Sequence, residues 1–149
     1  MIYFDTAYIL KCYINENGSE EVRSFASHHD LIACCEFGKM ELSAAFHRAL
    51  REGLIDVPYL DTIFEQFQQD EQDGVWIWLP LNRDIIESVV SSFKSLPATV
   101  YLRTGDAIHL KCAVSNNIVN LYTNDTHMLK AADRFGINAS NVITAVETE

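Results

Sequence analysis

The chain contains 149 residues, 48% of them hydrophobic, so it is long and apolar enough for one folded core and too apolar to be disordered. Lys and Arg number 11 against 21 Asp and Glu, and the net charge of -10 argues against avid, non-specific binding of nucleic acid. No apolar run is long enough to cross a bilayer, and Asp5 interrupts the apolar start that a secretion signal would need. We therefore expect a single cytoplasmic domain over residues 1–149, with no membrane partner.

The four cysteines do not match the spacing of a zinc site. Cys34 and Cys35 are adjacent, which suits neither an unstrained disulfide nor a shared tetrahedral metal site. Cys12 and Cys112 fall in apolar helical segments, where free cysteine behaves as a small buried hydrophobic residue. All four are interpreted as reduced thiols, in agreement with an intracellular protein.

The first half of the chain alternates short apolar runs with segments of helical periodicity. The predicted elements, in chain order, are a strand at 1–4, a helix capped by Thr6 and stopped by Asn17-Gly18, a helix capped by Ser19 and reaching about residue 27, a strand at 31–34 and a long helix over about 36–51.

The second half continues the alternation. Residues 75–79 form the clearest strand by residue type, being rich in aromatic and β-branched side chains; Trp76 and Trp78 are assigned no function, and core packing is expected for them. The other predicted elements are a helix opened by Pro58, a helix capped by Asn82 and ended at Leu96-Pro97, a helix capped by Thr104 and reaching about residue 115, a strand at 118–123, a helix over 125–135, a short strand at Val142 and Ile143, and a tail that frays from Glu147.

This alternation, without any two-residue hairpin signal, predicts an α/β fold with a mostly parallel sheet and helices on both of its faces. Ligands of such sheets bind beyond the carboxyl ends of the strands. Asp5 and Asp125 both stand directly after predicted strands, and we expect them at that edge.

Four acidic residues are candidates for a shared site: Asp5, Glu41, Asp106 and Asp125. Each also has a simpler explanation, since Asp5, Asp106 and Asp125 fall where helices begin and are capped. Glu41 could pair with Arg48 or face solvent, and Glu36 competes with it for the inward position. If the four converge, their charges call for divalent cations, and Mg²⁺ or Mn²⁺ bound to carboxylates supports phosphodiester hydrolysis by a metal-activated water.

Four blocks of the sequence together resemble the PIN-domain family, and within it the small VapC-type toxins of toxin–antitoxin pairs. The most specific block is 103–113, which is similar to the family's Asp-Ala-x-His-x-x-x-Ala helix. The others are 2–7, 41–48 and the block 121–125 with Leu129, Ala131-Ala132 and Gly136-Ile137 after it. The blocks follow the family's order, and the spacing of Ala45 and Arg48 favours Glu41 over Glu36.

The resemblance implies a PIN-like three-layer sandwich and a metal-dependent endoribonuclease that uses Mg²⁺ or Mn²⁺, the toxin of a type II pair. Its implied metal ligands are Asp5, Glu41, Asp106 and Asp125, with the hydroxyls of Thr6 and Thr123 orienting carboxylates. Arg48 and Arg103 are candidate RNA contacts. The alternatives are a non-catalytic PIN-like module that binds RNA or protein, and a general RNA-processing nuclease without an antitoxin.

Two further expectations concern packing and partners. His109 follows Asp106 by three residues and could bind metal or phosphate, but a packed, hydrogen-bonded histidine is the preferred interpretation. An antitoxin and a second copy of the chain are the expected protein partners. Their contacts are predicted on the early helices, where Tyr8, Ile9, Tyr13 and Phe25 would stay partly exposed, with simple core burial as the alternative.

Overall fold

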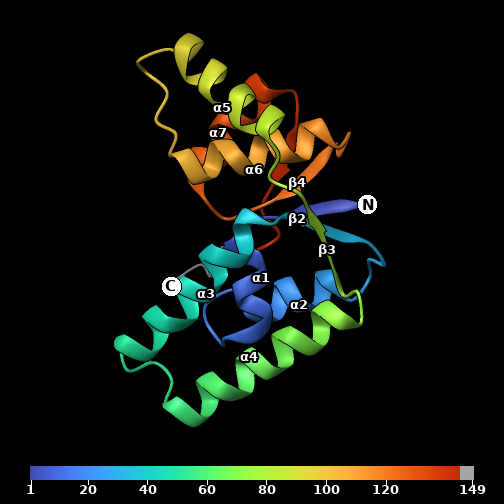
Figure 1. Ribbon diagram of the computed structural model, residues 1–149, viewed down its shortest axis with the longest axis vertical. Coiled ribbons are helices and arrows are strands. Elements are labelled where there is room, and N and C mark those ends of the chain that lie inside the picture. Colours follow the sequence, from blue (N-terminus) through green and yellow to red (C-terminus); the bar gives the residue numbers. More distant parts are fainter. Residues whose placement is uncertain (145–149) are drawn as a thin grey trace.

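The computed structural model describes residues 1–144, in which a five-stranded sheet lies between two layers of helices (Figure 1). The strands are β1 (Ile2–Phe4), β2 (Ile32–Cys35), β3 (Trp76–Leu79), β4 (Asn120–Tyr122) and β5 (Asn138–Ser140). All pairings are parallel, and the order across the sheet is β3-β2-β1-β4-β5. The predicted α/β class is therefore confirmed. The predicted fraying from Glu147 lies outside the described residues.

Helices cover both faces of the sheet, with α1 to α4 on one side and α5 to α7 on the other (Figure 1). Their bounds are α1 (Thr6–Tyr13), α2 (Ser19–Ala26), α3 (Phe37–Arg51), α4 (Val57–Gln72), α5 (Arg83–Ser95), α6 (Thr104–Ser115) and α7 (Thr126–Ala131), followed by the 3-10 helix η1 (Ala132–Phe135). The predicted three-layer arrangement is confirmed. Among residues 1–144, no helix has both the length and the apolar character that crossing a membrane requires.

The core forms around β1, the central strand, whose three residues are all buried. Parallel strands covered on both faces are continuously apolar, and Ile-Tyr-Phe fits that rule. The ring of Phe4 lies 5.1 Å from that of Tyr8 and 6.5 Å from that of Trp76, measured between centroids. The indole of Trp76 donates to the hydroxyl of Tyr13 at 2.7 Å, so the aromatic strand packs into the core as expected.

The structure corrects the position of the last strand. It is formed by Asn138–Ser140, and Val142 and Ile143, predicted to form it, follow it and pack half-buried against the core. The pattern missed this strand because its residues are polar or small and its pairing with β4 comes from tertiary contacts.

Three predicted helix caps are displaced by one residue. The N-caps of α1, α2 and α6 are Asp5, Gly18 and Arg103, each one residue before the hydroxyl residue predicted for that role (Thr6, Ser19 and Thr104). At α1 the reason is clear, because the carboxylate of Asp5 accepts from the backbone N–H of Tyr8 and leaves the hydroxyl of Thr6 for another partner.

The prediction that Tyr8 and Ile9 stay exposed for a partner is wrong, because they are only 0% and 1% exposed. Tyr13 and Phe25 are half-buried and pack against the core. Core burial, the alternative weighed for these residues, is therefore what the structure supports for Tyr8 and Ile9, whereas Tyr13 and Phe25 keep the predicted partial exposure.

The register of the sheet places two site residues side by side. Phe4 pairs with Tyr122, so the next residues, Asp5 and Thr123, leave the sheet together at its carboxyl edge. The strand order reverses beside β1, with β2 on one side and β4 on the other. Open parallel sheets bind ligands at such a reversal.

Candidate active site

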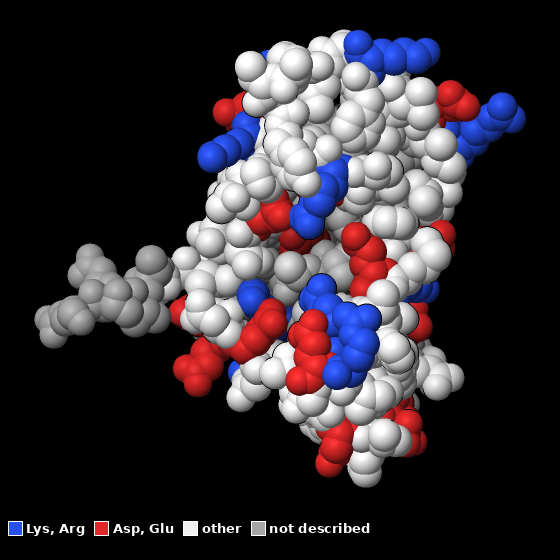
Figure 2. Space-filling view, turned by 90° about the vertical axis from the view of Figure 1, so that its left-hand side faces the viewer, with Lys and Arg blue, Asp and Glu red and all other residues white. Residues whose placement is uncertain are grey.

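A cavity of about 490 Å³ at the carboxyl edge of the sheet is lined by all four predicted carboxylates. They come from four separate places in the fold: Asp5 after β1, Glu41 on α3, Asp106 on α6 and Asp125 before α7. Three arginines, Arg48, Arg51 and Arg103, line the same cavity. Figure 2 shows acidic and basic side chains gathered around a hollow on one face of the molecule.

Asp5 is the most deeply buried of the four carboxylates, with 4% of the residue exposed. Its Oδ1 accepts from the N–H of Tyr8 at 3.0 Å and its Oδ2 from the hydroxyl of Thr123 at 2.5 Å. Burial raises the pKa of Asp5 to about 6, although these hydrogen bonds act in the opposite direction. The negative charge of Asp5 is therefore disfavoured by its surroundings, and a neighbouring cation would stabilise it.

Glu41 is held by a chain of hydrogen bonds. Its Oε2 accepts from the hydroxyl of Thr6 and from Nε2 of His109, both at 2.6 Å. Burial raises the pKa of Glu41, but the hydrogen bonds from His109 and Thr6 outweigh it and lower the pKa below its ordinary value. Glu41 thus faces the cavity as a carboxylate.

The chain continues behind Glu41 into the core. His109, 2% exposed, contacts the hydroxyl of Tyr3 through Nδ1 at 2.7 Å, and that hydroxyl accepts from the N–H of Cys35 at 2.9 Å. A carboxylate can only accept, so Nε2 carries a proton and donates it to Glu41. Burial lowers the pKa of His109, but its contacts with Cys34 and Glu41 outweigh burial and raise the pKa well above its ordinary value. The preferred interpretation of His109 as a packed, hydrogen-bonded residue is confirmed, but its link to Glu41 and the role of Tyr3 were missed.

Two glycines let the elements that carry this chain come close together. A Cβ at Gly105 would lie 2.9 Å from Oε1 of Glu41 and 3.3 Å from the ring of Phe37. A Cβ at Gly38 would lie 2.7 Å from Sγ of Cys34. Sequence reasoning missed both glycines, and the only signal is their place inside helices, where glycine is unfavourable without a packing reason.

Asp106 and Asp125 share one basic partner, Arg103. Its Nε lies 3.0 Å from Oδ2 of Asp106, and its Nη2 lies 3.2 Å from Oδ1 of Asp106 and 2.6 Å from Oδ2 of Asp125. The hydrogen bond to Asp106 raises the pKa of the guanidinium, so Arg103 stays charged. Arg103, a predicted RNA contact, is thus already paired with two of the carboxylates, and its contact with RNA stays a prediction.

Three of the carboxylates cap helices as well as lining the cavity. Oδ1 of Asp125 accepts from the N–H groups of His127 and Met128 at 2.8 and 2.9 Å, while its Oδ2 meets Arg103. Asp5 is the N-cap of α1, and Asp106 accepts from the N–H of Arg103 at 3.2 Å. Helix capping and a shared site are therefore compatible explanations for these carboxylates. The positive ends of three helices face the acidic cavity.

The two alternatives for the second acidic position are now distinguished. Glu41 pairs with His109, and no ion pair joins it to Arg48 within the described residues. Glu36 is exposed and does not line the cavity. The choice of Glu41 over Glu36 thus agrees with the geometry.

The donor types of the cavity fit a divalent cation, since carboxylate and hydroxyl oxygens are the ligands that Mg²⁺ and Mn²⁺ prefer. As they stand, however, no group of three or more His, Cys, Asp and Glu side chains among residues 1–144 is arranged to hold a metal ion. Each carboxylate has partners within the chain, and those of Asp106 and Asp125 include a cation. A metal ion could bind to Asp106 and Asp125 there only if their pairing with Arg103 opened.

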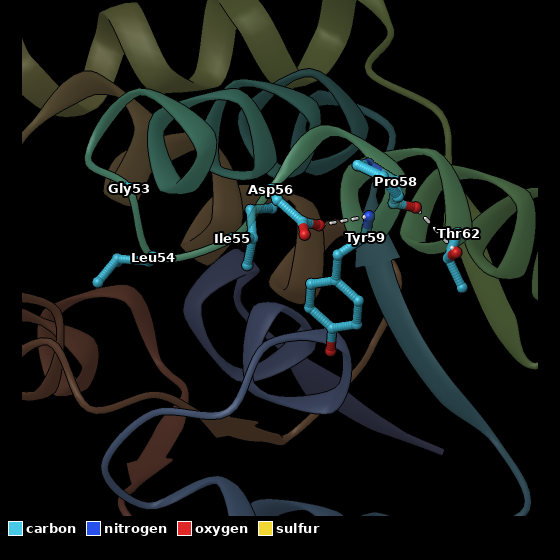
Figure 3. A pocket seen from close by; sticks show the side chains of 7 residues that line it. All are labelled: Gly53, Leu54, Ile55, Asp56, Pro58, Tyr59 and Thr62. Atoms are coloured by element: carbon cyan, nitrogen blue, oxygen red, sulfur yellow. Dashed lines mark hydrogen bonds between the residues drawn. The ribbon is translucent and has the colours of Figure 1, made fainter.

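A second hollow, of about 660 Å³, lies at the turn between α3 and α4 (Figure 3). Its carboxylate, Asp56, caps α4 by accepting from the N–H of Tyr59 at 2.9 Å, and the hydroxyl of Thr62 donates to the carbonyl of Pro58 at 3.0 Å (Figure 3). These polar groups satisfy the local backbone, so we assign the chemistry to the acidic cavity.

No protein-family model and no curated protein sequence matches the chain. Solved structures do match it. A crystal structure of FitAcB from Neisseria gonorrhoeae superposes with a TM-score of 0.70 at 19% identity, covering 95% of this chain and 98% of that one. A structure of FitAB bound to an IR36 DNA fragment gives 0.72 at 16% identity over 100% of both chains. A toxin–antitoxin complex from Klebsiella pneumoniae gives 0.60 at 17% identity, covering 87% of this chain and 90% of that one.

These matches extend over nearly the whole of each chain, but at 16–19% identity they establish the fold alone. The class defined by the fold is a three-layer α/β protein with a parallel five-stranded sheet, the fold shared with these structures. The resemblance drawn from the four sequence blocks is thereby confirmed at the level of the fold.

Proposed function

We propose that this protein is a metal-dependent endoribonuclease and the toxin component of a toxin–antitoxin pair. The observation that carries the proposal is the convergence of Asp5, Glu41, Asp106 and Asp125 on one cavity of a PIN-type fold. A non-catalytic module could cap its helices without bringing four carboxylates to one cavity, where their mutual repulsion destabilises the folded state.

The four carboxylates would hold Mg²⁺ or Mn²⁺, directly or through water. A bound ion would activate a water molecule for attack on an RNA phosphodiester and stabilise the negative charge that develops there. Thr6 and Thr123 orient Glu41 and Asp5 by donating hydrogen bonds to them. His109 keeps the carboxylate of Glu41 ionised and fixed in direction.

The approach of RNA requires a local basic surface, because the whole chain carries a net charge of -10. Arg48 and Arg51 are exposed, lie near the end of α3 and line the acidic cavity. We assign them to the phosphates on either side of the cleaved bond. The small basic patch favours an enzyme that engages a short segment of RNA.

The partner that we propose is an antitoxin protein. Support comes from the similar solved structures, which include a toxin–antitoxin complex and a FitAB complex bound to DNA. A homodimer and a cytoplasmic location stay predictions from the sequence.

The deciding experiment measures cleavage of a labelled RNA by the purified chain in EDTA and after Mg²⁺ or Mn²⁺ is added in excess. We expect cleavage only with the metal ion. Undiminished cleavage in EDTA would contradict the metal-dependent mechanism, and no cleavage under either condition would favour the non-catalytic module. Co-production with the product of a neighbouring reading frame distinguishes the remaining functions. Neutralisation by that product would identify a toxin, and undiminished RNA cleavage would identify a general RNA-processing nuclease.

Gly105→Ala should separate function from stability. The new Cβ would lie 2.9 Å from Oε1 of Glu41, so the carboxylate of Glu41 must move. Because the end of a glutamate side chain is flexible, it can move without disturbing the core. Alanine in place of glycine within α6 favours the helix by up to about 1 kcal/mol. We expect unchanged or higher stability in urea unfolding, with at least about tenfold slower RNA cleavage. Ser115→Ala, at the other end of α6, is the matched control.

A further inference from the structure

The side chain of Arg103 connects two of the four carboxylates. Its three contacts, at 2.6, 3.0 and 3.2 Å, engage both oxygens of Asp106 and one of Asp125. These are the same oxygens that a divalent cation would use in this part of the cavity. A guanidinium and a metal ion cannot both occupy them.

Arg103 is fixed at its backbone and movable at its tip. As the N-cap residue of α6, its N–H donates to Asp106, which holds the backbone beside the site. The side chain is 58% exposed, so the guanidinium can swing into solvent without unpacking the core. Charge-assisted contacts of this kind hold the side chain in place but are weakened by solvent.

We propose that Arg103 is a built-in counter-cation that competes with the divalent metal ion for Asp106 and Asp125, and that metal binding displaces its guanidinium toward solvent. The inference rests on the proposed function and adds a regulatory step to it. The displaced guanidinium, still anchored at residue 103, becomes available to a phosphate of the RNA, which it can bind in a bidentate manner.

The other members of the cavity lack this property. Asp5 and Glu41 accept from hydroxyl, backbone and imidazole donors that are mostly buried and serve to orient them. Arg48 lines the same cavity but forms no ion pair with any of the four carboxylates in the described part of the chain. Arg48 therefore provides a control with the same charge in the same cavity.

The test compares Mn²⁺ binding to the parent, Arg103→Met and Arg48→Met by isothermal titration calorimetry. Removal of the competing cation should tighten Mn²⁺ binding by about three- to tenfold in Arg103→Met, the range expected when two partly exposed ion pairs act together. Arg48→Met should stay within about twofold of the parent, because it removes an exposed charge that pairs with none of the four carboxylates and that salt screens.

If Mn²⁺ binding tightened equally in both variants, the cause would be the lower positive charge of the cavity as a whole, and the proposed role of Arg103 would be overturned. Unchanged or weaker binding in Arg103→Met alone would overturn it as well, while leaving the metal site of the proposed function intact. Absence of Mn²⁺ binding in all three proteins would overturn the proposed function and this inference together.

A second measurement uses the parent protein alone and so does not depend on how the variants fold. The ¹⁵N signal of the Arg103 Nε–H should be protected from solvent exchange without metal and lose that protection as Mg²⁺ is added. Protection that persists at saturating Mg²⁺ would show that the guanidinium stays on Asp106 and would contradict the displacement.

Discussion

Asp5→Asn and Asp106→Asn are each expected to lower RNA cleavage by more than about 100-fold, because each removes an anionic oxygen that the proposed metal ion needs. Asparagine keeps the shape of the side chain at both positions. At residue 5 its carbonyl can still accept from the N–H of Tyr8. The measurement is single-turnover cleavage of a labelled RNA at saturating Mn²⁺.

The Asp5→Asn variant should stay folded, because the pKa of Asp5 is raised in the folded protein. Burial raises this pKa to about 6, so the stability that comes from its proton is present at acid pH and is lost as the pH rises through 6. Neutral asparagine avoids that loss, and the variant should unfold in urea at pH 7 no more easily than the parent.

Glu36→Gln is the matched control for cleavage, since Glu36 is an exposed carboxylate five residues before Glu41 and outside the cavity. It should cleave RNA at the parent's rate. If the asparagine variants also cut as fast as the parent, the acidic cavity is not the catalytic centre.

His109→Ala is expected to lower the free energy of unfolding by about 3 kcal/mol, since it leaves a cavity and unpaired polar groups inside the protein. The hydroxyl of Tyr3, which is 0% exposed, loses its hydrogen-bond partner on the imidazole ring. Glu41 loses one of its two side-chain donors, and RNA cleavage should fall with it. Urea unfolding followed by circular dichroism measures the loss of stability.

His47→Ala provides the comparison, because His47 is exposed on α3 and should change stability by less than about 0.5 kcal/mol. Tyr3→Phe removes only the hydroxyl and should cost about 1–3 kcal/mol by leaving the Cys35 N–H unpaired. If His109→Ala is as stable as His47→Ala, the hydrogen-bond chain does not support the fold.

Much of the fold could be predicted from local pattern. Continuous apolar runs marked β1 to β3, and the alternation with amphipathic helices predicted a parallel sheet covered on both faces. The pattern failed at β5, whose residues are polar or small, because that strand depends on its pairing with β4. It also failed for Tyr8 and Ile9, because the apolar character that marks a core residue does not differ from that of a contact surface.

The sequence by itself identified the four carboxylates of the cavity. Their residue types, their positions near the ends of strands or within helices, and the order of the four blocks can all be read directly from the chain. Tertiary structure alone decided what holds them: the Tyr3–His109–Glu41 chain, the close approach at Gly105 and the pairing of Arg103 with Asp106 and Asp125. The hydrogen bond between Tyr3 and His109 joins residues 106 positions apart. Such contacts follow from sheet register and helix packing, which no local pattern encodes.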